Sequence, residues 1–210
     1  MQKPEAMALF PPEVDWFSYL MIFEDGIKID LSIVPVELLG NYLKNDGLIK
    51  LLLDKDGLVP NPPIPSDEKF WIDKPSAAFF DDCCNEFWFV STYVAKGLFR
   101  KELLFASYHM EHVAREQLFS MLSWKIGVAY GYGFSIGKHN KYINKYLTAN
   151  EWALLMKTYC MDSILNCWSA LDSAHELFRQ ASHFVADNLG YLYPDYDPQV
   201  TRYINKHKKA

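Results

Sequence analysis

The sequence predicts an α+β fold, in which a small sheet near the N-terminus is followed by a bundle of helices. The first observation is a pair of strand-like apolar segments that flank Asp25-Gly26, a dipeptide typical of tight hairpin turns. The second is that helical periodicity dominates the chain from Ser76 onward. Strands that come first and helices that follow as a separate block are typical of α+β proteins.

The hairpin is expected over residues 16–34. Residues 16–23 form a continuous apolar run, whereas residues 27–34 alternate between apolar and polar side chains. A short helix over 36–44 and a third strand over 48–53 complete the predicted sheet region. One face of the second strand carries Ile27, Ile29, Leu31 and Ile33, and the other carries Lys28, Asp30 and Ser32.

A proline-rich segment over residues 59–65 separates two predicted domains. Proline removes a backbone donor and fixes φ, so this segment can form neither a helix nor a central strand. The predicted domains are a sheet-containing part with its connector over 1–75 and a helical part over 76–210. Ser76 is the predicted N-cap of the first helix, because its hydroxyl can accept a hydrogen bond from an unpaired helical N–H.

The helical part is predicted to contain several helices joined by short loops. The glycine-punctuated residues 131–137 are interpreted as a tight interhelical loop, and Gly190 is the expected C-cap of the last helix. The tail over 191–198 is rich in tyrosine and is expected to pack back on the bundle. The predicted helices cover residues 81–108, 109–130, 141–146, 149–160 and 161–189.

Composition narrows the class of protein. The 210 residues are 50% hydrophobic and carry a net charge of −5, and nothing suggests the clustered Lys and Arg that phosphate-backbone recognition requires. No apolar run approaches the roughly 20 residues that span a bilayer, and the start has no signal-peptide pattern. We therefore expect no nucleic-acid partner, no membrane segment, a cytoplasmic location and reduced cysteines.

Asp30 is the most informative single residue of the predicted hairpin. Aspartate is disfavoured in strands, and this one lies mid-strand on the polar face. It is either a solvent-facing polar residue of a half-exposed sheet or a metal-binding carboxylate that projects from that sheet. Mg²⁺ is commonly held by one or two carboxylates together with substrate phosphates, so a lone aspartate needs partners from elsewhere.

A second candidate group lies on the helix that begins near Asp81. At 100° per residue, its polar side chains fall within a stripe about 80° wide, acidic at the N-terminal end and basic at the other. One interpretation is an ordinary solvated face with ion pairs, because acidic residues near a helix N-terminus also suit the helix dipole. The neighbouring positions are unusually aromatic, which favours the other interpretation, a cleft lining. The stripe consists of Asp82, Glu86, Tyr93, Lys96 and Arg100.

Two further motifs are weaker. His109 and His112 have an i, i+3 spacing that could hold a metal, but the HExxH pattern and a third ligand are lacking, which favours a surface or helix-end position. Residues 131–138 imitate a phosphate-binding loop but fail its pattern, because Tyr132 occupies a glycine position and His139 replaces Ser or Thr. Neither motif receives a functional role from the sequence.

A resemblance to a known family rests on six segments spread along the chain, namely PEAMALFPP, WFSYLMIFEDGIKIDLSIVP, DDCCNEFWFVSTYVAKGLFRKELLFA, YCMDS, HELFR and LGYLYPDYD. Together they resemble the bacterial aminoglycoside 6-adenylyltransferases, also called streptomycin adenylyltransferases. The resemblance implies a nucleotidyltransferase fold, in which a mixed sheet precedes a helical domain. It also implies transfer of AMP from ATP to the 6-hydroxyl of streptomycin, with Mg²⁺ as cofactor and antibiotic resistance as the outcome.

The resemblance and the helix face together suggest roles for individual residues. Family members use three sheet carboxylates, and Asp30 occupies the I-D-L position of the third, which implies a metal ligand or an activator of the attacking hydroxyl. From face and charge, Lys96 is the candidate for a triphosphate contact, and Asp82 and Glu86 are candidates to bind the guanidinium groups of streptomycin. The remaining predicted substrate contacts are Trp88, Tyr93 and Arg100.

The sequence departs from the family pattern before Asp30. The Gly-Ser turn and the paired DxD carboxylates of the family do not occur there, and Met1 corresponds to an internal position of longer members. The sequence therefore predicts a chain without the N-terminal part of the nucleotidyltransferase domain. The alternative function is then a catalytically inactive remnant, whose helical domain is only a binding or structural module. We expect a monomer or a homodimer, since an exposed sheet edge can pair with a second copy.

Overall fold

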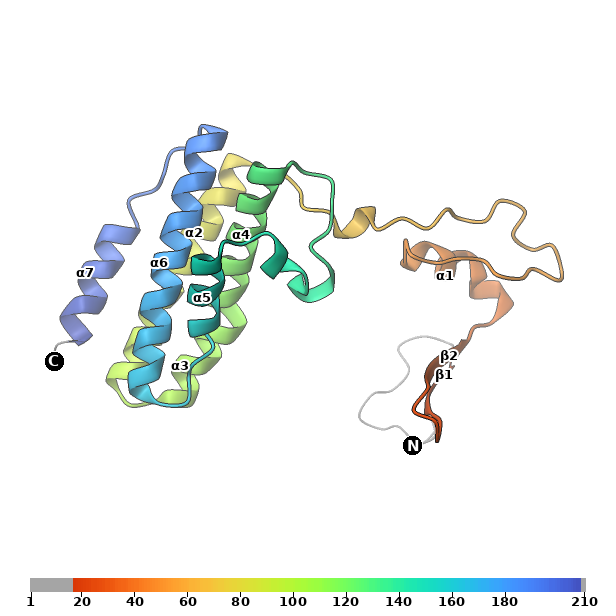
Figure 1. Cartoon of the computed structure of the whole chain (residues 1–210), viewed down its shortest axis with the longest axis horizontal. Helices are drawn as coiled ribbons and strands as arrows, with labels where there is room; N and C mark the ends of the chain where they lie inside the picture. The colour runs from red at the N-terminus through yellow and green to blue at the C-terminus, as the bar shows by residue number, and fades with distance from the viewer. Residues whose placement is uncertain (1–16, 209–210) are drawn as a thin grey trace. The chain divides into compact units, whose positions relative to one another are not determined.

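The chain divides into two compact units, Met1–Lys69 and Phe70–Ala210, in a computed structural model that describes residues 17–208. The first unit contains a hairpin and a short helix, and the second contains helices α2 to α7 (Figure 1). A short sheet region followed by a block of helices is the α+β arrangement that the sequence predicts. The predicted division into domains over 1–75 and 76–210 stays a prediction.

The hairpin of the first unit consists of β1 (Phe17–Ile22) and β2 (Lys28–Ile33), which pair antiparallel. Gly26 has a φ of 84°, a conformation that glycine adopts without strain. The Asp25 carboxylate accepts a hydrogen bond from the Ile27 N–H at 3.0 Å and so closes the turn. The predicted hairpin is thereby confirmed, apart from its first residue, which lies outside the described part of the chain.

The segment after the hairpin agrees with the prediction only in part. A 3₁₀ turn over Val36–Leu38 leads into α1 (Leu39–Asn45), which confirms the predicted short helix. The predicted strand over 48–53 is wrong, because these residues form no strand and the sheet of the described residues has two strands. The segment has no paired strand to satisfy its backbone groups, and Leu52 stays 86% exposed.

The first unit has no core within its described residues. None of residues 17–69 is buried, and the large apolar side chains on both strands of the hairpin are exposed. Two strands and one short helix remove too little apolar surface from water to form a core. Every buried residue of the described chain therefore belongs to the helical unit.

The helical unit opens with α2 (Ala77–Phe99), and its N-cap is confirmed, because the Ser76 hydroxyl accepts a hydrogen bond from the Phe79 N–H at 3.1 Å. The helix ends earlier than predicted. Lys101 has a φ of 61°, and the chain reverses there into α3 (Leu103–His109). The predicted single helix over 81–108 is therefore wrong at its C-terminal end.

Gly97 makes this reversal possible. A Cβ at this position would lie 2.9 Å from the Phe105 ring and 3.0 Å from the Ala106 backbone nitrogen. Only glycine permits α3 to return so close to α2. No glycine or proline occurs at the turn itself, so the sequence carried no breaker signal at the place where the helix ends.

The predicted break after residue 108 is also wrong, since α3 continues through a π-helical turn over Met110–Ala114 into α4 (Arg115–Tyr130). The glycine loop over 131–137 ends α4 as predicted. A 3₁₀ turn over Lys138–Asn140 follows the loop, and a second over Ile143–Lys145 replaces the helix predicted over 141–146. Three glycines of the loop have positive φ, namely Gly131, Gly133 and Gly137.

The last helices are α5 (Ala149–Lys157), α6 (Ile164–Leu189) and α7 (Asp197–Lys208). Gly190 ends α6 in the left-handed conformation with a φ of 69°, which confirms the predicted C-cap. The predicted packing of the tail is confirmed by Tyr191, whose hydroxyl donates to a backbone carbonyl in the segment before α2 at 2.7 Å. Helix α7 was not predicted.

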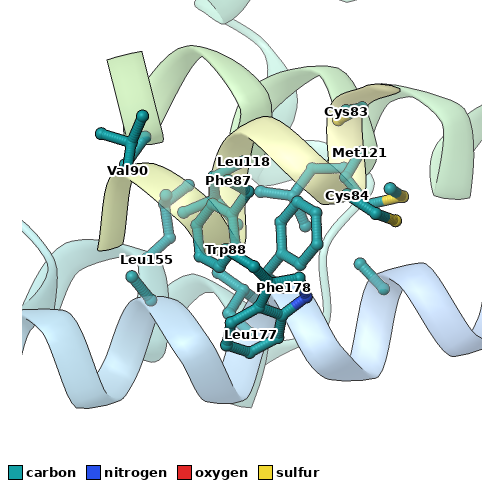
Figure 2. Packing of buried hydrophobic residues seen from close by; sticks show 14 of the residues in the cluster. Cys83, Cys84, Phe87, Trp88, Val90, Leu118, Met121, Leu155, Leu177 and Phe178 are labelled. Atoms are coloured by element: carbon teal, nitrogen blue, oxygen red, sulfur yellow. The ribbon is translucent and has the colours of Figure 1, made fainter. Parts of the chain in front are cut away.

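The core lies where α2, α4 and α6 pack against one another (Figure 2). The rings of Phe87 on α2 and Phe178 on α6 are stacked, with centroids 3.8 Å apart and planes 4° apart. Trp88 meets Phe178 edge-on at 5.9 Å, and all three side chains are 0% exposed. Burial of rings of this size dominates the stability of the unit.

Buried charges are paired and join neighbouring helices. Lys125 on α4 forms an ion pair with Glu151 on α5, and Arg179 on α6 binds Asp197 on α7 at 2.5 Å. Burial raises the pKa of Glu151, but hydrogen bonds from Lys125 and Thr148 outweigh it and hold that pKa below its ordinary value. The cysteines of the described chain are free thiols, as predicted, and none of its helices is long and apolar enough to cross a membrane.

His175 gives the helical unit a predictable response to acid. Its ring lies in the core beside Phe87 and Trp88, and its Nε2 has no hydrogen-bond partner among the described residues. Burial, followed by repulsion from Arg179, lowers the pKa of His175 from 6.5 to about 4. Between these values the unfolded chain binds a proton that the folded chain does not, so stability rises with pH. We expect the free energy of unfolding to fall by about 3 kcal/mol from pH 6.5 to pH 4 through this group.

Urea unfolding at pH 4, 5, 6 and 7 measures this effect. His175→Gln removes the titrating group, so the variant is expected to lose less stability than the parent on acidification. His112→Gln, at an exposed histidine of the π-helical turn, is the matched control and is expected to keep the parent slope. Equal slopes for parent and His175→Gln would contradict the prediction.

Candidate functional site

Asp30 lies in the middle of β2, opposite Leu20 of β1, and its side chain is 53% exposed. The Nζ of Lys28 lies 3.2 Å from its carboxylate. Ser32 is the next residue on that face. Its hydroxyl forms a hydrogen bond with the hydroxyl of Ser18 on the other strand, with the two oxygens 2.9 Å apart. The hairpin therefore presents one accessible carboxylate on its polar face, beside a cation that competes for it.

The arrangement of His, Cys, Asp and Glu side chains decides whether the described part of the chain could hold a metal ion. Residues 17–208 contain no group of three or more His, Cys, Asp or Glu side chains that could hold a metal ion, so His109 and His112 stay without a third ligand. Asp30 supplies a single carboxylate. One carboxylate is too few to hold a metal ion by itself. It could complete the coordination of Mg²⁺ that is already bound to phosphates, since such an ion needs only one or two protein carboxylates.

The predicted stripe lies on the surface of the helical unit and is referred to below as the α2 stripe, with the members Asp82, Glu86, Tyr93, Lys96 and Arg100. Glu86 is half-buried and the other four are exposed. No ion pair involves any charged member among the described residues, so the face is not the network of salt bridges that an ordinary solvated helix would form. Its charges remain available to a ligand.

Aromatic rings from α3 surround the C-terminal half of the stripe. The ring of Tyr93 meets those of Phe89 and His109 edge-on, each with centroids 5.4 Å apart. His109 in turn lies 4.3 Å from the ring of Phe105. The Nζ of Lys96 is 6.0 Å from the rings of both Tyr93 and Phe105, at the outer limit of a cation–π contact. The structure thus brings Tyr93 and Lys96 together on one aromatic surface.

Sequence reasoning missed the contribution of Phe105 and His109 to this surface. Both come from α3, which lies beside the stripe only because the chain reverses at Lys101. The signal was Gly97, a glycine inside a long helical pattern, which indicates close backbone approach.

Trp88 is not part of the α2 stripe. It follows Asp82 by six residues and therefore points about 120° away from it around the helix axis. Its ring lies in the core between α2 and α6, where Figure 2 shows it beside Phe178. The predicted substrate contact of Trp88 is corrected to a packing role, because a fully buried indole offers no face to a ligand.

A pocket of about 650 Å³ opens at the other end of α2. Its walls come from residues 70–76 and Phe79, from the middle of α4 and from residues 136–140. A backbone hydrogen bond from Ile72 N–H to the Phe134 carbonyl, at 2.9 Å, ties the segment before α2 to the glycine loop. This pocket was not predicted, since three segments distant in sequence form it.

A family model described as streptomycin adenylyltransferase matches residues 1–207 of the chain. The chain belongs to the streptomycin adenylyltransferase family. Aminoglycoside 6-adenylyltransferase of Bacillus subtilis (strain 168) is 48% identical over 205 residues, which are 97% of this chain and 72% of that relative. The enzymes of the same name from Campylobacter jejuni and Staphylococcus aureus are 48% and 44% identical, covering 100% and 99% of this chain and 73% and 74% of their own lengths.

The fold of this family member also matches a solved structure. The crystal structure of an aminoglycoside 6-adenyltransferase from Bacillus subtilis is 42% identical, aligns with a TM-score of 0.63, and is matched over 100% of this chain and 78% of that one. The resemblance to an adenylyltransferase family and the α+β fold class are thereby confirmed. The prediction that an N-terminal part of the nucleotidyltransferase domain is missing stays a prediction.

Proposed function

We propose that this family member transfers AMP from ATP to a hydroxyl of a streptomycin-like aminoglycoside and so confers resistance in the cytoplasm, where ATP is available. Relatives named aminoglycoside 6-adenylyltransferase, at 44–48% identity over nearly the whole chain, support the reaction class. The inactive-remnant alternative is not favoured by these comparisons. The oligomeric state, monomer or homodimer, remains part of the proposal.

The observation that carries the substrate class is the unpaired acidic end of the α2 stripe. Asp82 and Glu86 are one helical turn apart and face the same way. Streptomycin carries guanidinium groups, and a carboxylate can receive two parallel hydrogen bonds from such a group. The aromatic surface at Tyr93 supplies a flat apolar contact for a sugar ring.

The remaining roles follow from charge. In the transfer, the drug hydroxyl oxygen attacks the α-phosphorus, the bond to the β-phosphate breaks, and pyrophosphate leaves. Asp30 accepts the hydroxyl proton or serves as one carboxylate ligand of Mg²⁺, which neutralises phosphate charge when bound. Lys96 contacts the triphosphate, and Arg100 contributes a second cation at the same end of the stripe.

Incubation of the chain with ATP, Mg²⁺ and streptomycin tests the proposal. Release of pyrophosphate that requires both ATP and streptomycin, together with a drug whose mass has increased by one AMP moiety, is the expected result. Absence of the adenylylated drug at enzyme concentrations comparable to substrate would overturn it.

Glu86→Gln tests the substrate site without catalysis. The change keeps the shape of the side chain but removes its charge, so calorimetry without ATP is expected to show streptomycin affinity reduced about tenfold or more. Glu116→Gln, at an exposed glutamate on α4, is the matched control and should bind like the parent. Unchanged affinity in Glu86→Gln would remove Glu86 from the site.

A further inference from the structure

A complete heptad pattern runs along the exposed face of α2. Phe89 follows Asp82 by seven residues, so it lies about 20° from Asp82 around the helix axis and within the width of the α2 stripe. With Phe89 included, successive members are 4, 3, 4, 3 and 4 residues apart, which is the spacing of the contact positions in a coiled coil. These six residues are called the α2 seam, namely Asp82, Glu86, Phe89, Tyr93, Lys96 and Arg100.

The α2 seam is open within the helical unit. Glu86 is half-buried and the other members are exposed, Phe89 by 53% and Tyr93 by 36%. No charged member forms an ion pair with any of residues 17–208. The rings of Phe105 and Tyr108 on α3, 38% and 59% exposed, extend the apolar surface to one side. Helix α2 thus presents the contact positions of a coiled coil, and no helix of this unit covers them.

The charges of the α2 seam are self-complementary when the helix is reversed. Asp82 and Arg100 each lie nine residues from Ser91, on opposite sides of it. Glu86 and Lys96 each lie five residues from it. A second copy of α2 that runs antiparallel and is centred at the level of Ser91 therefore places every acidic member opposite a basic one. A parallel copy would place like charges together, which disfavours that orientation.

The two aromatic members obey the same symmetry. Phe89 and Tyr93 each lie two residues from Ser91, so the antiparallel arrangement brings the four rings of two copies together at its centre. Aromatic side chains at the centre with charged side chains around them are typical of protein–protein interfaces. The seam extends about 27 Å along the helix axis from Asp82 to Arg100, so the interface is small and we expect reversible association.

We propose that this chain forms a homodimer in which the α2 seams of two copies pack antiparallel about a twofold axis at the level of Ser91. Asp82 then faces the partner's Arg100, and Glu86 faces the partner's Lys96. Because the axis is twofold, each of these pairs occurs twice. The dimer also covers the surface assigned above to streptomycin, so the drug and the second copy compete for it. This competition rests on the proposed function, whereas the dimer does not.

Sedimentation equilibrium of the full chain over a range of protein concentrations tests the dimer. The parent is expected to change reversibly from monomer to dimer as the concentration rises. Glu86→Lys and Lys96→Glu are each expected to weaken self-association about tenfold or more, because each places like charges opposite one another twice. Glu116→Lys, at an exposed glutamate on α4, is the matched control and is expected to associate like the parent.

An equimolar mixture of Glu86→Lys and Lys96→Glu tests the predicted pairing itself. In a mixed pair, each lysine at these two positions lies opposite a glutamate of the other chain. The mixture is therefore expected to dimerise at concentrations where each variant alone is monomeric. Thermal melting of each variant confirms that it is folded.

Three results would overturn the dimer. They are a parent that stays monomeric up to millimolar concentration, single variants that associate as tightly as Glu116→Lys, and a mixture that stays monomeric where the parent dimerises. Streptomycin at matched ionic strength is expected to shift the parent toward monomer, by mass action. If the dimer forms and saturating streptomycin leaves it unchanged, the competition and the proposed drug site on the α2 stripe fail and the α2 seam stands. A parent that binds streptomycin but never dimerises gives the reverse outcome.

Discussion

Phe178→Ala is expected to lower the free energy of unfolding of the helical unit by about 3–5 kcal/mol. Phe178 lies at the centre of the core, stacked on Phe87 at 3.8 Å and edge-on to Trp88. The truncation removes a whole ring that three helices enclose. The variant therefore loses the transfer free energy of the ring, and the cavity that remains destabilises it further. For a unit of this size the melting temperature should fall by about 10 °C, which calorimetric or circular dichroism melting measures.

A matched phenylalanine on the surface provides the control. Phe89 is half-exposed on α2 and touches Tyr93 at the edge of its ring. Phe89→Ala is expected to change stability by less than about 1 kcal/mol, because most of that ring already faces water. If the two truncations lowered the melting temperature equally, the core would not be where the structure has it.

Asp30→Asn is expected to reduce the rate of adenylyl transfer about 10²–10³-fold. The amide keeps the shape of the side chain but can neither accept a proton nor supply a charged ligand to a metal on ATP phosphates. Initial rates of pyrophosphate release at saturating ATP and streptomycin measure the change. The melting temperature should stay at the parent value, because the side chain is exposed and belongs to no core.

Asp56→Asn distinguishes this effect from a general change of charge in the first unit. Asp56 is exposed in the loop before the proline-rich connector, and its variant is expected to turn over like the parent. A parent-like rate in Asp30→Asn would show that the family's third carboxylate position carries no catalytic role in this chain.

Features that depend on local sequence were predictable. The Asp25-Gly26 turn, the Ser76 N-cap and the Gly190 C-cap each need only one or two residues with the right side chain or φ, and all three are confirmed. Helix α7 was missed although Asp197 and Pro198 form a plausible helix start, because Gly190 was the expected C-cap of the last helix.

Features that depend on tertiary contacts were not predictable. The apolar run over 48–53 has the composition of a strand, but a strand requires a partner, and the described sheet offers none. The reversal at Lys101 depends on α3 packing against Gly97. The glycine marks the position of a close contact in the sequence, but it does not identify the helix that packs there.

The same distinction holds for the candidate sites. The α2 stripe follows from helical period alone, and periodicity also points Trp88 away from it, which the prediction overlooked. The aromatic surface at Phe105 and the pocket lined by Lys138 each assemble segments from different helices and loops. Only the folded bundle reveals them.

The confinement of the core to the helical unit has an evolutionary consequence. Among the described residues, every side chain that a substitution could force to repack lies beyond residue 69. Substitutions in the hairpin region can therefore change the surroundings of Asp30 with little effect on the stability of the protein. The helices hold that stability, so selection on the polar face of the hairpin can proceed in one stretch of the gene while selection for foldability acts on another.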